Sequence, residues 1–263
     1  VMESVQRFYR HASLSYKALH GTMVAKTYFL FMIFSPVMQM LFWGFLVRFI
    51  YEGKDLAGYI AANALLLSVF SAVFGMMTVV MGDRSSGTLS IVIATPINKA
   101  LLFVARTIPH IVNGFITSII GLLLGIVVFD LTITFNQFSI LMCIWLVSVF
   151  AACSLGLILG SASLWTPSMH MLSNFLSSLL LLLSGASYSF SILPSYLQSL
   201  AQAFPLMRGV ELTKQLLNEN NTSQLFPLLS QEFLLGCLYL IIGFIVIRFA
   251  ERLARKAGTL ELH

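Results

Sequence analysis

Serine and histidine side chains are the groups in this sequence that could form a nucleophilic site. Ser163 and Ser187 each supply a hydroxyl, and His170, which lies between them in the chain, could accept its proton. A nucleophile elbow needs a glycine on both sides of the serine, and the run around Ser187 has only the first, Gly185. A serine hydrolase therefore stays only as an alternative from another functional class.

The sequence contains no motif typical of a metal site or a nucleotide site. Gly53–Lys54 is followed by Asp55, and the sequence holds no Gly-x-x-x-x-Gly-Lys-Ser/Thr loop for binding phosphates. We expect the three cysteines, which all lie in apolar stretches, to be packing residues. The other histidines show no His-Glu-x-x-His spacing: His11, His20, His110 and His263. We expect this chain to bind no metal or cofactor.

The composition is that of a membrane protein. Of 263 residues, 58% are hydrophobic and only 10% are charged, and the mean hydropathy is +0.91. A soluble domain carries about 25% charged residues, so this composition excludes a cytosolic enzyme, a nucleic-acid binder and a disordered chain. No cleavable leader precedes the first long apolar stretch, and we expect the whole chain to be mature. The hydrolase alternative is accordingly an intramembrane one.

Long stretches without charged residues predict an all-α polytopic protein with six transmembrane helices. A helix needs about 20 residues to cross the hydrocarbon core, and each of the first three stretches exceeds this length. The fourth runs from Leu131 to Met207, and Trp165–Thr166–Pro167 divides it into two spans. The predicted spans are 27–47, 56–82, 107–129, 138–162, 169–187 and 233–250.

The distribution of cations predicts the orientation. With both termini in the cytoplasm, eleven Lys and Arg residues lie on the inner side and four on the outer side. This bias follows the positive-inside rule. We therefore expect a multi-pass protein of the plasma or inner membrane with both termini cytoplasmic.

Small residues recur at helical spacing inside two predicted spans. Gly121 and Gly125 form one such pair, and Ala152, Gly156 and Gly160 form a second series. This spacing lets helix backbones approach closely and predicts packing contacts.

Three segments are neither spans nor simple loops. Residues 1–24 predict an amphipathic helix in the cytoplasmic interface, with apolar residues at helical spacing and Arg7 and Arg10 off that stripe. Residues 83–99 form a cytoplasmic link with a short apolar face that ends at Thr95–Pro96. Residues 188–230 contain two helical stretches, 196–204 and 206–217, that are too short to span the membrane. We expect them to be re-entrant helices in the outer leaflet.

The link and the outer segment carry motifs that resemble the permease subunit of a type-2 ABC exporter. The link of that family reads acidic–basic–x–x–Gly–Thr–Leu, and Asp83–Arg84–Ser85–Ser86–Gly87–Thr88–Leu89 matches it with Asp in place of the usual Glu. The run after the fifth span is matched by Ser184–Gly185, Leu193–Pro194 and Pro205–Leu206. The resemblance covers nearly the whole chain, which it implies to be a single transmembrane domain, 1–263.

The resemblance implies ATP-driven export. A separate cytoplasmic ABC ATPase would bind the ATP and Mg²⁺, and a second permease copy would complete a homodimer or heterodimer in the lipid bilayer. Coupling to the ATPase would pass through the link and the N-terminal helix, at Arg7, Arg10, Asp83, Arg84, Ser85, Ser86, Gly87, Thr88 and Leu89.

Polar and adaptable side chains inside the spans are the candidates for a substrate pathway. A buried amide in lipid needs a partner, so we expect such residues to face protein or a water-filled path. The candidates are Met38, Gln39, Phe42, Asn63, Ser71, Asn174 and Ser177. Each of the polar ones could equally join helices to one another.

The predicted spans carry no charge near their middle, which disfavours ion-coupled transport. It also favours an apolar or amphipathic cargo, such as a drug, an antibiotic or a lipid-like compound. Export of a lipid-linked glycan is the alternative within transport, and no nucleic acid is expected as a partner.

Overall fold

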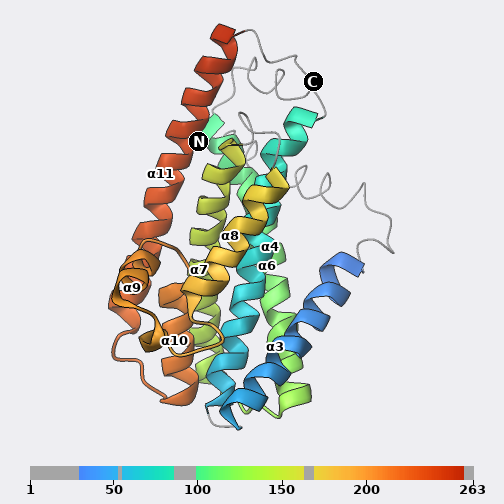
Figure 1. Cartoon of the computed structure of the whole chain (residues 1–263), viewed down its shortest axis with the longest axis vertical. Coiled ribbons are helices and arrows are strands. Elements are labelled where there is room, and N and C mark those ends of the chain that lie inside the picture. Colours follow the sequence, from blue (N-terminus) through green and yellow to red (C-terminus); the bar gives the residue numbers. More distant parts are fainter. Residues whose placement is uncertain (1–29, 53–54, 86–98, 163–168, 258–263) are drawn as a thin grey trace, which may run out of the picture.

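The computed structural model describes residues 30–52, 55–85, 99–162 and 169–257, and every regular element in these ranges is a helix. The predicted all-α class is confirmed (Figure 1). A short π-helix, η1, precedes α3, and a short 3-10 helix, η2, precedes α9. The elements are η1 Leu30–Phe34, α3 Ser35–Tyr51, α4 Leu56–Ser85, α6 Lys99–Phe129, α7 Phe135–Ala162, α8 Met169–Ser184, η2 Phe190–Ile192, α9 Ser195–Gln202, α10 Met207–Asn218 and α11 Leu225–Ala257.

Helix α4 is the centre of the bundle. It contacts α3, α6, α7, α8 and α10, and 78% of its most apolar window is buried. Small residues bring its neighbours close: a Cβ on Gly121 of α6 would lie 2.7 Å from the Cβ of Ala64, and one on Gly156 of α7 would lie 2.9 Å from the carbonyl oxygen of Val73. The packing contacts predicted from the small-residue spacing are confirmed at these two glycines.

Four helices of the described part are long and apolar enough to cross a membrane, namely α4, α6, α7 and α11. The other two predicted spans correspond to α3, with 17 residues, and α8, with 16. At a rise of 1.5 Å per residue α8 reaches only about 24 Å, less than the ~30 Å hydrocarbon core, whereas α3 continues from η1 without a break. The described residues thus support four spans, and the predicted count of six is not established by them.

The last span begins earlier than predicted. The sequence places its start at Phe233, directly after an acidic residue, whereas α11 begins at Leu225 and its apolar window runs to Phe249. Glu232 therefore lies within the span rather than in front of it, and its side chain is fully buried. A side-chain partner that only the tertiary fold supplies makes this burial possible.

The helix ends gather at two levels of the bundle. The C-terminal ends of α4, α7 and α11 and the N-terminal end of α6 lie together at the top of Figure 1. The connections 130–134 and 219–224 lie at the opposite end. Helix α4 continues through Ser85, so Asp83, Arg84 and Ser85 belong to its last turn instead of a separate link. Residues 1–29 and 86–98, with the rest of the predicted coupling elements, lie outside the described residues.

Close packing of α7 on α4 leads to a first prediction. Gly156→Leu would place side-chain atoms against the backbone of Val73, and overpacking of this kind costs about 1–3 kcal/mol. We expect a lower unfolding temperature of the purified protein in detergent, followed by intrinsic fluorescence. Cys143→Leu, on an exposed position of the same helix, is the matched control, and an equal loss in both variants would contradict this packing.

Candidate functional site

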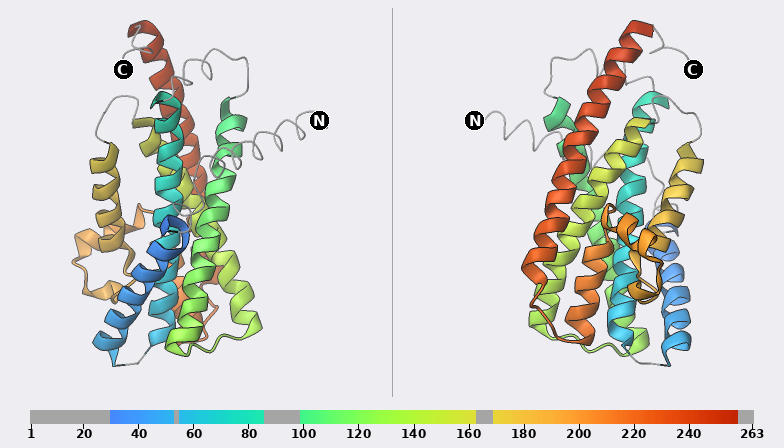
Figure 2. Two further views of the ribbon diagram at one scale, coloured as in Figure 1. Left: turned by 90° about the vertical axis from the view of Figure 1, so that its right-hand side faces the viewer. Right: turned by 60° about the vertical axis from the view of Figure 1, so that its left-hand side comes forward.

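Several of the predicted pathway residues lie on one side of the bundle. Helices α3 and α8 both contact α4 and occupy the same side of the molecule in the left view of Figure 2. Gln39 and Phe42 of α3 are exposed, as is Asn174 of α8. The amide of Gln39 donates only to the neighbouring Ser35 hydroxyl, at 3.0 Å. We call this surface, with Met38, Gln39, Phe42, Asn174 and Ser178 exposed on it, the α3–α8 face.

The remaining predicted pathway residues are less open. Ser71 and Ser177 are half-buried, and the Ser177 hydroxyl donates to the Ser173 carbonyl of its own helix. Asn63 is fully buried: its amide donates to the carbonyls of Tyr59 and Ala186, at 2.9 and 3.2 Å. In this conformation Asn63 joins α4 to the chain that follows α8, and its place in a pathway stays a prediction.

Helix α8 ends at Ser184, where Gly185 adopts a left-handed conformation with φ of +65°. Glycine is the residue that most easily ends a helix in this way. The next four carbonyls then lie outside any helix, and each accepts a hydrogen bond from a side chain of another element. The pairs are Gly185 with Lys214, Ala186 with Asn63, Ser187 with Tyr51, and Tyr188 with Lys214.

Lys214 of α10 is the charged member of this group. Its ammonium donates to two of the four carbonyls, at 2.8 Å for Tyr188, and lies 4.0 Å from the ring centre of Tyr59. The Tyr59 ring in turn stacks on Tyr51, with ring centres 4.2 Å apart. We call Tyr51, Tyr59, Asn63 and Lys214 the loop clamp.

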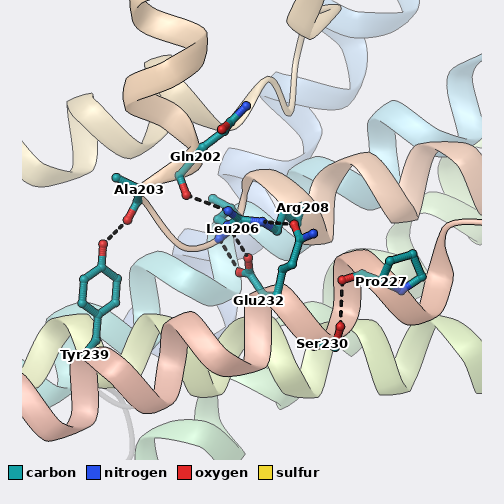
Figure 3. Close-up of polar contacts among 9 residues, drawn as sticks. Gln202, Ala203, Leu206, Arg208, Pro227, Ser230, Glu232 and Tyr239 are labelled. Atoms are coloured by element: carbon teal, nitrogen blue, oxygen red, sulfur yellow. Dashed lines mark hydrogen bonds and ion pairs between the residues drawn. The ribbon is translucent and has the colours of Figure 1, made fainter.

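A second polar group holds the connection between α9 and α10 (Figure 3). Leu206 precedes α10 with φ of +95°, and its N–H donates to the buried Glu232 carboxylate at 2.6 Å. The other carboxylate oxygen lies 3.6 Å from the Arg208 guanidinium, which also donates to the Gln202 carbonyl. The Tyr239 hydroxyl donates to the carbonyl of Ala203. We call Arg208, Glu232 and Tyr239 the corner clamp.

Both clamps use residues that the sequence analysis did not select. Arg208 and Lys214 were counted only as outer cations, and Glu232 only marked the edge of a span. A signal existed for Glu232, since it is the only acidic residue between Glu219 and Glu251 and lies in the mostly apolar stretch 225–249. Its partner, 24 positions away, belongs to a different helix, and no local pattern connects the two.

The described side chains do not bring together a nucleophilic site of the kind that the hydrolase alternative requires. The Ser187 hydroxyl donates to the amide oxygen of Asn63 at 2.9 Å, and an amide does not accept a proton as a general base does. The side chains of Ser163 and His170 lie outside those described. The described residues also hold no cluster of three or more groups that would bind a metal ion.

The corner clamp generates a second prediction. Glu232→Leu leaves the Arg208 guanidinium without its counter-charge and the Leu206 N–H without its acceptor, and breaking a buried ion pair costs about 3–5 kcal/mol. We expect a large drop in the unfolding temperature in detergent. Adding Arg208→Met removes the unpaired charge. The double variant should therefore lose less stability than the sum of the losses in the two single variants.

The matched control for the corner clamp is Glu219→Gln, which removes an exposed carboxylate at the end of α10. It should change stability by no more than about 0.5 kcal/mol. Additive losses in the Glu232 and Arg208 variants would show that the two side chains do not act as a pair.

Comparison with known proteins agrees with the helical architecture. The sequence model of the ABC-2 type transporter family matches residues 16–217, which include α3 to α9, all of α10 but its last residue, and the loop clamp. A search of curated proteins found no match. The family match covers well over half of the 263 residues and confirms the resemblance seen in the sequence motifs. The chain therefore belongs to the ABC-2 type transporter family, as a membrane permease component without ATPase activity of its own.

Proposed function

We propose that this protein is the permease of an ATP-driven exporter of apolar or amphipathic small molecules, and that the α3–α8 face lines the substrate pathway. A separate ABC ATPase supplies the energy. Two permease copies enclose the pathway between their α3–α8 faces. Both termini and the coupling segments lie in the cytoplasm.

The contrast between two exposed surfaces carries this proposal. The exposed side chains of α11 beyond its exposed Gln231 include a continuous apolar stripe, which suits contact with lipid: Leu234, Leu238, Ile241, Ile245 and Phe249. The α3–α8 face mixes apolar side chains with the exposed amides of Gln39 and Asn174. The Gln39 amide has only the Ser35 hydroxyl of its own helix as a partner. An exposed amide with few partners is costly in hydrocarbon, so this face suits contact with protein or water.

The chemistry of the same face supports the substrate class. Its side chains are aromatic, thioether, amide and hydroxyl groups, and none of the exposed residues that define the face is charged. Methionine and aromatic side chains adapt to apolar ligands of varied shape. Amides supply the few hydrogen bonds that an amphipathic molecule needs. A lipid-linked glycan would need a longer polar surface. The transport test below distinguishes this substrate from an amphipathic small molecule.

The position of the corner clamp along α11 supports re-entrant helices between α8 and α11. Glu232 and Tyr239 lie roughly 10 and 20 Å along α11 from Leu225, within the apolar window that ends at Phe249. They bind the backbone at 203–206, and in this proposal that backbone lies at the level of the membrane interior. Non-helical backbone is tolerated at this depth only where protein satisfies it, and the clamps supply those partners.

The ends of the helices support the proposed orientation and coupling. α4 continues past its apolar window, which ends at Val79, to Ser85, and α6 begins at Lys99 beside it at the same end of the bundle (Figure 1). This end carries the larger share of the cations and is the side where an ATPase would dock. A push on the segment between these helices would act on α4, the central helix.

Reconstitution tests the proposal. The chain is co-purified with the P-loop ATPase that binds it, inserted into inverted vesicles, and supplied with ATP and a fluorescent amphipathic cation or a radiolabelled lipid-linked glycan. We expect ATP-dependent uptake of the first and not of the second. The double variant Asp83→Ala, Arg84→Ala should insert normally and keep ATP turnover while losing transport. Absence of a bound ATPase and of any ATP-dependent uptake would refute export.

Side chains of the α3–α8 face give a further prediction. Replacing Gln39 and Asn174 by Leu removes the exposed amides from this face without removing a described contact between helices. We expect transport to fall by about tenfold, as the loss of one or two hydrogen bonds to a substrate would produce. Ile241→Ala, on the exposed stripe of α11, should transport normally, and equal losses in both variants would contradict this location of the pathway.

A further inference from the structure

The two clamps hold the segment between α8 and α10 with different kinds of interaction. At the corner clamp the charges are paired, since the Arg208 guanidinium and the Glu232 carboxylate lie 3.6 Å apart. At the loop clamp, the Lys214 ammonium has no carboxylate within ion-pair distance among the described residues. It is surrounded by carbonyl oxygens and an aromatic ring, which are neutral groups.

Lys214 nevertheless contributes most to the loop clamp. It binds two of the four free carbonyls after α8, whereas Asn63 and Tyr51 bind one each. Hydrogen bonds from a charged donor are roughly twice as strong as neutral ones. The contact of Tyr51 with Ser187 is also the longest, at 3.5 Å. Loss of Lys214 would leave two carbonyls unsatisfied in apolar surroundings, which is costly.

Helix α8 packs on α4, α9 and α10, and Leu176, Leu180 and Leu183 are buried on its packed face. Met171 and Phe175, near its start, are exposed by 77% and 64%. After Ser184 the chain leaves the helix, and its carbonyls are held by the polar contacts of the loop clamp. The outer end of α8 is therefore held by its apolar packing together with these polar contacts.

We propose that Lys214 is the positioning residue that fixes the outer end of α8, and that release of its two carbonyl contacts frees this end while the corner at 203–206 stays attached to α11. The importance of this movement for transport rests on the proposed function, because α8 carries Asn174 and Ser177. The attachment itself does not depend on that function. Lys214 thus sets where one wall of the pathway stands.

The test follows the exposure of a buried reporter. Ala186 is fully buried beside the contacts of Lys214, and Ala186→Cys is introduced into a chain whose native cysteines are replaced. The full chain in membranes is treated with a membrane-impermeant maleimide. We expect labelling about tenfold faster with Lys214→Met than with Lys214, the ratio that a lost charged contact of this kind would produce. Lys214→Arg, which keeps the cation, should label as slowly as the parent.

Two further variants keep the test decisive. Tyr59→Phe keeps the ring beneath the ammonium and should label as slowly as the parent. Lys214→Gln replaces the cation by a neutral donor of similar length. If the Lys214→Met variant does not accumulate in the membrane, the labelling rate is measured in Lys214→Gln instead. Labelling of Lys214→Gln or Lys214→Met at the rate of Lys214→Arg would overturn the proposal.

Transport is measured in the same variants as a separate readout. Fast labelling of Lys214→Met in a protein that never transports would refute the exporter function and leave the positioning role standing. Slow labelling with lost transport would refute the positioning role and leave the exporter function standing. Rescue of both readouts by Lys214→Arg is the result expected if both proposals are correct.

Discussion

The need to satisfy broken backbone inside a membrane-spanning bundle is the constraint on which the outer half of this structure depends. Helix α8 ends at Ser184, and the chain does not return to a long helix until Leu225. The four carbonyls after Ser184 lie outside any helix, and side chains of other elements supply their hydrogen-bond donors. The positions of the half-buried Lys214 and the buried Glu232 are explained by this requirement, since each binds backbone groups of the segment.

Close packing on α4 makes these contacts possible. Alanines and glycines bring α6 and α7 against α4, and α10 fits beside them because Gly209 lies against Ser148 of α7. The Trp145 indole N–H also donates to the Thr213 hydroxyl at 3.2 Å, which orients α10 along α7. With α10 held in this way, Lys214 points at the end of α8 and Arg208 at Glu232. The rigid part of the bundle thus positions the side chains that hold its less regular part.

The arrangement also separates the roles of the helices. α11 contacts mainly α7 and presents an apolar stripe outward, on the side opposite α3 and α8 in the right view of Figure 2. α3 and α8 are shorter, contact α4 from the other side, and expose amides. A bundle of this kind has one side suited to lipid and one suited to a partner or a pathway.

The sequence by itself determined the all-helical class, the family, four of the spans and the close approach of α4 to its neighbours. These follow from composition, from the length of apolar stretches and from small residues at helical spacing, all of which are local properties of the chain. Only the tertiary structure decided that Asn63 binds the chain after α8, that α11 begins before Glu232, and that Lys214 and Glu232 bind backbone. Those contacts join positions from 26 to 123 residues apart, and a buried charge is stabilised by where its partners come to lie in space rather than by its neighbours in sequence.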